Sequence, residues 1–459
     1  MKEYKMRNAG LFALSLAMPV WAMAAEPERI AHTTNEAELI TSEVFHKLTL
    51  QGGYGPEDSL LGADEDRFYS IRYEPTFIWY EPEKRWPRWM VFTRGWLAYD
   101  SGNSSSPLRE DDQQQVDGFN AELREFYLRR SLFNDDPALS LTLGRQRFAD
   151  RSGLWWDDTF EALRLDYAGA FTRGFVAAGQ KFFNYNTDVN SLDPRDKDII
   201  HVLGQYGWHW RHAQWAGLKF MYSDDHSGDN PEDPSDFNGY RLGAFMHGNT
   251  VNENASSDYR LEVAMVNGER ELQNSTSDTT AVDIQGWAVQ GEFGLQLQQY
   301  AWQPRIALYA GMTDTPDEDD NGFFLNRIQS DRLINDRTYS TRLVSSAFRV
   351  DMRNLLYYGA GVELHPTERS ILELRVSDMQ LRNAAGPLPL RTDSPRNTDS
   401  QSLGQVIDLN YYWQNFPLAY RGRLFNLNTL ASASYLSPGD ATPDLDDQYQ
   451  ISLGIIMHY

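Results

Sequence analysis

The sequence of 459 residues contains no cysteine, and only 7 of its 42 basic residues are lysine. The lack of cysteine excludes a disulfide framework and any thiolate metal site. After residue 20 the chain has no apolar run of the roughly 20 residues that a membrane-spanning helix needs. The formal net charge of −23 argues against nucleic acid as a partner.

The first residues are typical of a secretory signal peptide. Basic residues at positions 2, 5 and 7 precede an apolar run at 9–20, and Ala-Met-Ala at 22–24 supplies a cleavage site. The chain is therefore expected to be exported, without disulfides to stabilise it. The expected organisation is a signal peptide at 1–24, an N-terminal periplasmic segment at 25–42 and a transmembrane β-barrel at 43–459.

Apolar and polar residues alternate in about 18 segments between residue 45 and the C-terminus, which is the period of β-strands. The links after even-numbered segments are mostly tight, and those after odd-numbered segments are long and polar. The long links fall at 101–118, 184–198, 223–236, 315–353 and 382–401. Short turns on one side and long loops on the other are typical of bacterial outer-membrane barrels.

The aromatic content agrees with a membrane barrel. Aromatic residues make up 13% of the chain, with 13 Trp and 24 Tyr, and such residues collect at the two membrane interfaces. The last segment, 449–459, alternates without a break and ends on tyrosine. We therefore expect an all-β protein, an antiparallel transmembrane barrel of about 18 strands in the bacterial outer membrane, with short periplasmic turns and long extracellular loops. A soluble secreted β protein is the alternative.

Charged residues stand opposite the apolar face in several segments. In 161–168 the apolar residues at odd positions share one face, and Arg164 and Asp166 share the other. An arginine on the lipid face costs about 2 to 4 kcal/mol at the membrane midplane, so these side chains are expected to point inward. About 18 strands enclose an aqueous channel, which implies passage of a solute.

The neighbouring arginines are ambiguous. Arg145 and Arg147 follow Gly144 and share the parity of Leu143, so strict alternation places them on the apolar side. A bulge at Gly144 would turn them toward the lumen. Without a bulge, they line the outer rim of the barrel.

Arginine binds carboxylates and phosphates through two parallel hydrogen bonds, and lysine does not replace it at such sites. The inner-face parity predicts a basic pore lining. Its candidate pore-lining and substrate-binding residues are Lys47, Arg72, Arg94, Arg124, Arg145, Arg164, Asp166, Arg241, Arg260, Arg375 and Arg423. The alternative is a structural ladder, in which the arginines pair with Glu122, Asp166, Glu262, Glu373 and Asp408.

Sites of other kinds are weakly marked. Asp317, Asp319 and Asn321 match part of a calcium-binding loop, but Ile328 stands where its closing glutamate belongs. A solvated acidic rim is the favoured explanation of this cluster, so we expect no cofactor, and a loop-bound calcium ion is the alternative. The sequence has neither a nucleophile-elbow motif nor a phosphate-binding glycine loop, so no enzyme is expected. An outer-membrane enzyme with its site near Trp155 and Asp157 is the less favoured alternative.

Two regions carry a family resemblance. The motif Gly144-Arg-Gln-Arg147, the residues Trp155-Trp-Asp157 and the run Glu161-Ala-Leu-Arg164 resemble the alginate export family of outer-membrane porins, and FFLNRIQSDR at 323–332 is a looser match. The resemblance implies a barrel of about 18 strands with an electropositive constriction for an anionic polysaccharide. It places Arg145 and Arg164 in the pore, with Lys47, Arg72 and Arg124 on earlier strands. In place of that family's long late periplasmic loop, only 414–420 is expected to join two strands.

Together these features predict a monomeric porin that passes anionic polysaccharide or oligosaccharide, or another carboxylated solute, by passive diffusion. Its other partners would be outer-membrane lipid and lipopolysaccharide. A general or nutrient-uptake porin without preference for uronates is the alternative within transport.

Overall fold

The protein is described from a computed structural model. The structure describes residues 41–55, 67–82, 87–101, 117–133, 136–227, 235–275, 278–317, 321–326, 328–329, 332–334, 340–390, 392, 395–420 and 423–459. Within this part of the chain no helix is long and apolar enough to cross a membrane.

Nearly all regular structure is β-strand. The strands are β1 (Ser42–Tyr54), β2 (Arg67–Tyr80), β3 (Trp89–Ser101), β4 (Asp117–Phe133), β5 (Asp136–Ala149), β6 (Asp157–Ala168), β7 (Thr172–Gln180), β8 (Ile199–Arg211), β9 (Gln214–Asp225), β10 (Ser235–Val251), β11 (Ala255–Ser275), β12 (Asp278–Leu297), β13 (Arg305–Thr313), β14 (Arg332–Ile334), β15 (Ser340–Arg342), β16 (Leu355–Thr367), β17 (Ser370–Leu381), β18 (Ser402–Tyr420), β19 (Arg423–Pro438) and β20 (Gln448–His458). A short 3-10 helix, η1, spans Pro194–Asp196.

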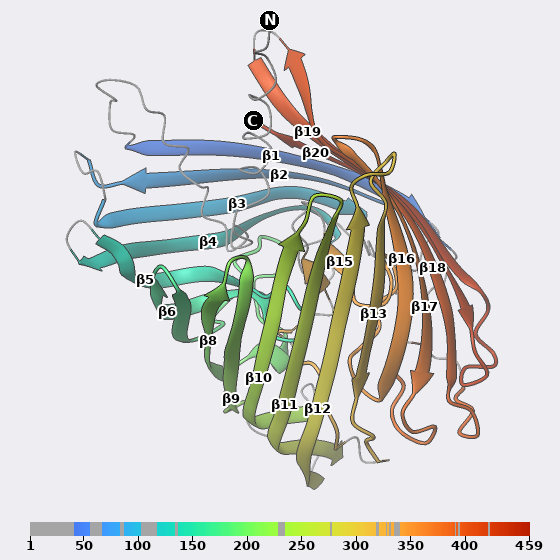
Figure 1. Cartoon of the computed structure of the whole chain (residues 1–459). Helices are drawn as coiled ribbons and strands as arrows, with labels where there is room; N and C mark the ends of the chain where they lie inside the picture. The colour runs from blue at the N-terminus through green and yellow to red at the C-terminus, as the bar shows by residue number, and fades with distance from the viewer. Residues whose placement is uncertain are drawn as a thin grey trace, which may run out of the picture.

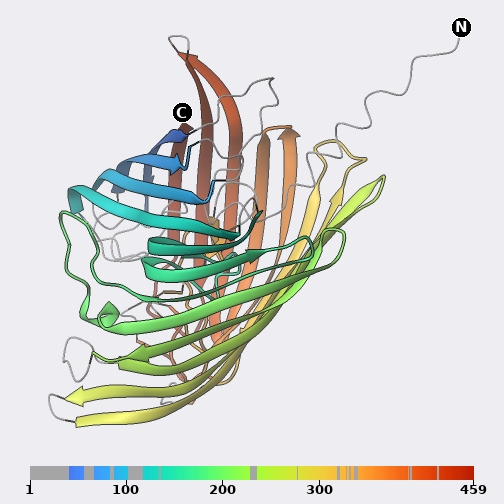
Figure 2. The ribbon, with the colours of Figure 1, turned by 90° about the vertical axis from the view of Figure 1, so that its left-hand side faces the viewer.

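Eighteen of these strands form one antiparallel sheet, and β14 and β15 form a separate two-stranded sheet. The sheet is closed, because β1 pairs with β2 on one edge and with β20 on the other. Figure 1 and Figure 2 show the wall curving from the blue strands through green and yellow to red. The prediction of an 18-stranded barrel is confirmed.

The outer face of the wall is apolar. Leu143, Leu218 and Ile451 are 59%, 63% and 57% exposed, and such residues alternate with buried polar ones such as Thr142 and Lys219. An exposed apolar belt on the strands of the wall far exceeds what a soluble monomer tolerates. The outer face therefore contacts lipid, and the buried polar residues mark the inner face.

The links between strands follow the expected division. The stretches that join successive strands are long after β3, β7, β13 and β17, at one end of the barrel, and tight turns such as 212–213 and 368–369 join strands at the other end. The expectation that every link at this end is long was wrong. β11 ends at Ser275 and β12 begins at Asp278, so the link between them is tight.

A second expectation about the links was wrong. Residues 414–420 are not a connection but the end of β18, and β19 begins at Arg423. β17 stops pairing with β18 at Trp413, and β20 stops pairing with β19 at Asn426. The strands beyond these points pair only with each other, so the β18–β19 hairpin projects from the rim (Figure 1).

The hydrophobic core lies inside the barrel rather than between two sheets. Two segments supply much of it, and we name them the Trp loop (150–156) and the long insert (the described residues of 321–353). Trp155, Phe323 and Phe348 are at most 1% exposed and pack in one cluster with Phe148 and Phe160 of the wall. Two connections thus fold back into the lumen and fill part of it.

Candidate functional site

Strands β2, β3 and β4 carry a stack of cations on an indole ring. The guanidinium groups of Arg72 and Arg124 lie 4.2 Å and 4.1 Å from the ring centre of Trp96. The Trp96 indole N–H donates to Glu74 at 2.7 Å, which fixes the ring. Arg72, Glu74, Trp96 and Arg124 lie on the inner face. Along each strand these residues alternate with outward-facing, exposed residues such as Leu97.

A β-bulge concentrates charge beside this stack. The register between β3 and β4 shifts at Arg94, so β4 has one extra residue, and both Arg124 and Glu125 are buried. Arg94 forms ion pairs with Glu125 and, at 3.6 Å, with Glu74. Lys47 of β1 lies 3.7 Å from the same Glu74 carboxylate. Four predicted basic residues therefore gather on β1–β4.

Arg164 and Asp166 lie where parity places them. The register sets Arg164 opposite Ala177 and Asp166 opposite Phe175, on the inner face of β6 and β7. Arg164 forms an ion pair with Asp166 at 2.7 Å, and its guanidinium lies 4.3 Å from the Phe175 ring. Their predicted contact with a solute stays a prediction.

Arg145 requires a correction. β5 pairs with β4 and with β6 in unbroken register through Gly144. No bulge therefore turns Arg145 inward, and Arg145 lies opposite Phe126 of β4 and Glu161 of β6. Its guanidinium is held within the wall by the carbonyls of Leu123 and Phe183, each 3.1 Å away. Arg147 contacts Asp157 at 2.9 Å. Arg145 is therefore a wall residue, and the prediction that a bulge brings it into the lumen is wrong.

The glycine beside it is needed for the close approach of two strands. Gly144 has a φ of 129°, a value that L side chains rarely adopt. A Cβ at this position would lie 2.4 Å from the carbonyl oxygen of Phe126 on β4. This requirement, rather than a bulge, accounts for the glycine in the motif.

A buried charged triad anchors the Trp loop to the wall. The ammonium of Lys219 contacts Asp150 at 2.7 Å and Glu262 at 2.6 Å, and the Trp155 indole N–H also donates to Glu262 at 2.6 Å. Burial alone would raise the pKa of Asp150, but Lys219 and donors from Ser152 hold this pKa below its usual value. Asp150 therefore stays ionised and binds the loop.

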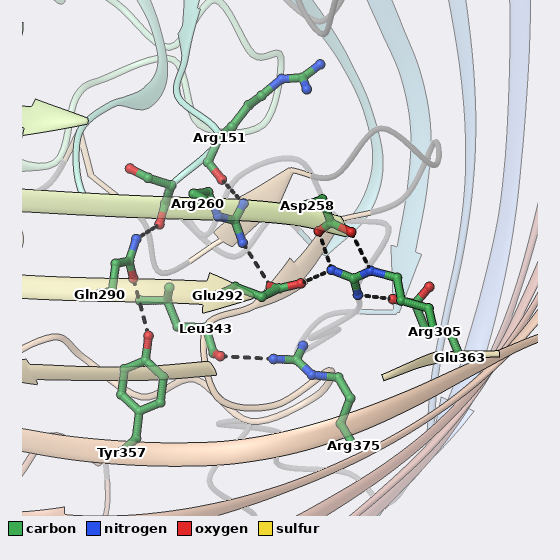
Figure 3. A network of polar contacts seen from close by, with 11 residues as sticks. Arg151, Asp258, Arg260, Gln290, Glu292, Arg305, Leu343, Tyr357, Glu363 and Arg375 are labelled. Atoms are coloured by element: carbon green, nitrogen blue, oxygen red, sulfur yellow. Dashed lines mark hydrogen bonds and ion pairs between the residues drawn. The ribbon is translucent and has the colours of Figure 1, made fainter. Parts of the chain in front are cut away.

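A network of arginines and carboxylates crosses β11, β12, β13 and β16 (Figure 3). Arg305 contacts Asp258 at 2.5 Å, Glu292 at 2.7 Å and Glu363 at 2.6 Å. Arg260 contacts Glu292 at 3.3 Å and donates to the carbonyl of Arg151 at 3.4 Å. The arginines here pair with carboxylates, as in the predicted structural ladder, but these carboxylates are not the ones predicted for it.

The long insert is held by β17 and β18. Arg375 donates to the carbonyl of Leu343 at 3.2 Å (Figure 3), and Ser377 donates to Val344 at 2.8 Å. Asp408, only 1% exposed, accepts hydrogen bonds from the Ser345 hydroxyl and from the next main-chain N–H. The insert is therefore bound by buried polar groups.

Three remaining predictions have different outcomes. Arg241 of β10 lies on the inner face and is 1% exposed. Arg423 pairs with Tyr420 in the projecting hairpin, which corrects the prediction that it lies on a wall-spanning strand; its side chain is outside the described residues. Asp317 and Asn321 hydrogen-bond to each other at 2.8 Å, but Asp319 lies outside the described residues. The calcium site stays a prediction.

Sequence reasoning missed an aromatic residue and several inner-face cations, among them Lys219 and Arg305. Lys219 alternates with Leu218 and Phe220, and Arg305 alternates with Ile306, so the parity argument could have found both. The role of Trp96 depends on its contacts with Arg72 and Arg124 across three strands, and the sequence does not reveal it.

Comparison with known proteins identifies relatives. A family model described as alginate export matches residues 84–450. The alginate production protein AlgE of Pseudomonas syringae pv. tomato is 32% identical over 126 residues, which cover 28% of this chain and 26% of that protein. AlgE of Azotobacter vinelandii is 25% identical over 387 residues, covering 74% and 76% of the two chains. The chain thus spans about a quarter of the first relative's length and three quarters of the second's.

Solved structures of two Pseudomonas aeruginosa proteins share the fold. OccK8 (OprE) of Pseudomonas aeruginosa has a TM-score of 0.58 at 11% identity, with 91% of this chain and 97% of that chain covered. The outer membrane protein opdK of the same organism has a TM-score of 0.56 at 12% identity, with 91% and 98% covered. At this identity the likeness concerns the fold alone.

Proposed function

Because the chain belongs to the alginate export family and forms a porin-like barrel of the bacterial outer membrane, we propose that it conducts an acidic polysaccharide by passive diffusion. The solute would be alginate-like, with carboxylates along its length, and would pass arginines of the inner face. We expect the channel to act as a monomer surrounded by outer-membrane lipid and lipopolysaccharide.

The observation that carries this proposal is the stack of Arg72 and Arg124 on Trp96. Stacking occupies the flat faces of the guanidinium groups, whereas their N–H bonds lie along the edges and suit the two oxygens of a carboxylate. Lys47 and Arg94 add positive charge on neighbouring strands. Uronate carboxylates would exchange between these cations, with contacts weak enough for the chain to leave.

The inserted segments indicate which part of the lumen is open to the solute. Their hydrogen bonds reach β9 through Lys219, β11 through Glu262, β17 through Arg375 and β18 through Asp408. The stack lies on β2–β4, away from these strands along the wall. We infer that the solute passes between the inserted segments and the β1–β4 wall.

A general porin without uronate preference is the second candidate. It is favoured by the close pairing of Arg94, Arg124 and Arg305 with carboxylates, which reduces the net charge that a solute meets. The two candidates differ in their response to an acidic oligosaccharide.

Single-channel recording in planar bilayers tests the proposal. The wild type should be anion-selective by its reversal potential, and a mannuronate oligomer should block its current at lower concentration than a neutral mannose oligomer does. In Arg72→Gln/Arg124→Gln, the oligomer concentration for half-block should rise roughly a hundredfold, because two charged hydrogen bonds of about 1.5 kcal/mol each are lost.

Arg369→Gln is the matched control, because it removes one arginine at an exposed turn. Cation selectivity of the wild type would overturn the proposal. Equal block by the acidic and the neutral oligomer would favour the general porin instead.

A further inference from the structure

Arg241 is a buried cation whose surroundings are aromatic. Its guanidinium lies 4.7 Å from the Phe324 ring, 5.4 Å from the Phe237 ring and 5.6 Å from the Phe323 ring. One terminal nitrogen donates to the Phe324 carbonyl at 2.6 Å. Its Nε and its other terminal nitrogen have no hydrogen-bond partner among the residues that the structure describes.

This environment leaves part of the charge uncompensated. A buried cation is normally paired with an anion, because burial removes its hydration. Aromatic faces attract a guanidinium, but more weakly than a carboxylate that accepts two hydrogen bonds does. The Phe324 carbonyl is a neutral acceptor and uses only one of the three nitrogen atoms. The site therefore has unused capacity for an anion.

The carbonyl that covers Arg241 belongs to the first residues of the long insert. These residues are attached to the wall at other points: the Phe323 N–H donates to Asp314 at 3.0 Å, and the Gln285 N–H donates to the Asn321 carbonyl at 3.0 Å. Gly286 permits their approach, because a Cβ there would lie 2.1 Å from the Phe323 nitrogen. The covering segment, 321–326, is thus packed on β12 and reaches across to Arg241 on β10.

A second cation lies on the same aromatic ring. Arg270 of β11 is 7% exposed, and its guanidinium is 5.2 Å from the Phe324 ring. Removal of Phe324 from between the two arginines would bring an anion within reach of both. A carboxylate suits this position, because its two oxygens match the guanidinium edge.

We infer that Arg241, with Arg270 beside it, forms an anion-binding site that the 321–326 segment covers in the closed channel and that a carboxylate of the solute uncovers. The Phe324 carbonyl occupies the place of a carboxylate oxygen until an acidic saccharide competes for it. The solute then releases the segment that narrows its own path. This inference rests on the proposed function, because it requires an acidic solute to reach the lumen.

Thiol labelling tests the inference. The natural chain has no cysteine, so Ile328→Cys provides a single reporter at a site that is 3% exposed and adjacent to the covering segment. The labelling rate of this thiol by a maleimide is measured in liposomes, with a mannuronate oligomer or with a neutral mannose oligomer. Mannuronate should raise the rate roughly tenfold, the scale of one charged hydrogen bond, and mannose should not.

Two substitutions of Arg241 are made in this background, and the folded barrel of each is verified by its electrophoretic mobility before and after heating. Arg241→Met removes the cation and its donors. Arg241→Gln keeps a donor for the Phe324 carbonyl but removes the charge, so the closed segment should remain held. Both variants should lose the acceleration by mannuronate, and the control Arg369→Gln should keep it.

The outcomes separate this inference from the proposed function. Full acceleration in both Arg241 variants, or none in the parent while its pore remains anion-selective, would overturn the inference and leave the proposed function in place. A cation-selective parent would overturn both.

Discussion

Replacement of Lys219 by methionine should destabilise the barrel and release the Trp loop. Lys219 lies between Asp150 and Glu262 at 2.7 Å and 2.6 Å, and the three side chains are 4%, 7% and 3% exposed. The substitution keeps the apolar stem but leaves two buried carboxylates without their cation. Removal of one partner from a buried ion pair costs about 3 to 5 kcal/mol, so we expect a loss of this size in the free energy of unfolding.

Urea unfolding followed by tryptophan fluorescence gives that free energy. Single-channel conductance is the second measurement, and it should rise, because the freed Trp loop no longer fills the lumen. Lys219→Met/Asp150→Asn/Glu262→Gln is the control, because it removes all three charges and should recover most of the lost stability.

Either of two results would refute this reasoning. The first is a Lys219→Met barrel within about 0.5 kcal/mol of the wild type, the range of ordinary surface substitutions. The second is a triple variant as unstable as the single one, which would mean that packing of the lysine stem, and not charge, anchors the loop.

Three further predictions concern single positions. The stability difference between wild type and Asp150→Asn should be constant at neutral pH and shrink as pH falls below the ordinary carboxyl pKa of 3.8, because a lowered folded pKa gives stability that acid removes; a difference unchanged at pH 3 would contradict this. Without solute, Arg241→Met should raise the free energy of unfolding by about 1 kcal/mol or more, since it removes a buried cation without a carboxylate; a loss of stability would count against that description. Gly144→Ala should lower it by about 1 to 3 kcal/mol, through backbone strain and contact with the Phe126 carbonyl, and an alanine barrel as stable as wild type would show that β4 can move away.

The strands of the barrel could be predicted because the sequence pattern that marks each strand is local. Alternation of period two marks strands one at a time, and the inner-face parity of Arg164 or Arg375 follows from their immediate neighbours. Loop lengths then distinguish the two ends of the barrel. The bulge in β4 breaks this alternation. Alternation alone therefore does not predict that the consecutive residues Arg124 and Glu125 are both buried on the inner face.

The interior of the lumen could not be predicted, because its contacts join residues far apart in the chain. The hydrogen bond between Arg241 and Phe324 and that between Ser345 and Asp408 link a strand to a connection that reads as a polar loop. Nothing local distinguishes a loop that folds inward from one that extends into solvent. The two alternatives at Gly144, a bulge or an unbroken strand, could not be separated from the sequence, because the need for this glycine comes from β4.

The pairing of β1 with β20, which closes the barrel, limits how fast the barrel can assemble. It places Lys47 opposite His458, so the sequence separation across this one contact is nearly the length of the chain. Contacts of such long range are slow to form, and until they form β1 and β20 each present an unpaired edge on which another strand can pair. A chain interrupted before β20 is synthesised leaves the second edge of β1 without its partner. We therefore expect closure of this seam, and not formation of the individual hairpins, to limit the rate at which the channel reaches its finished state.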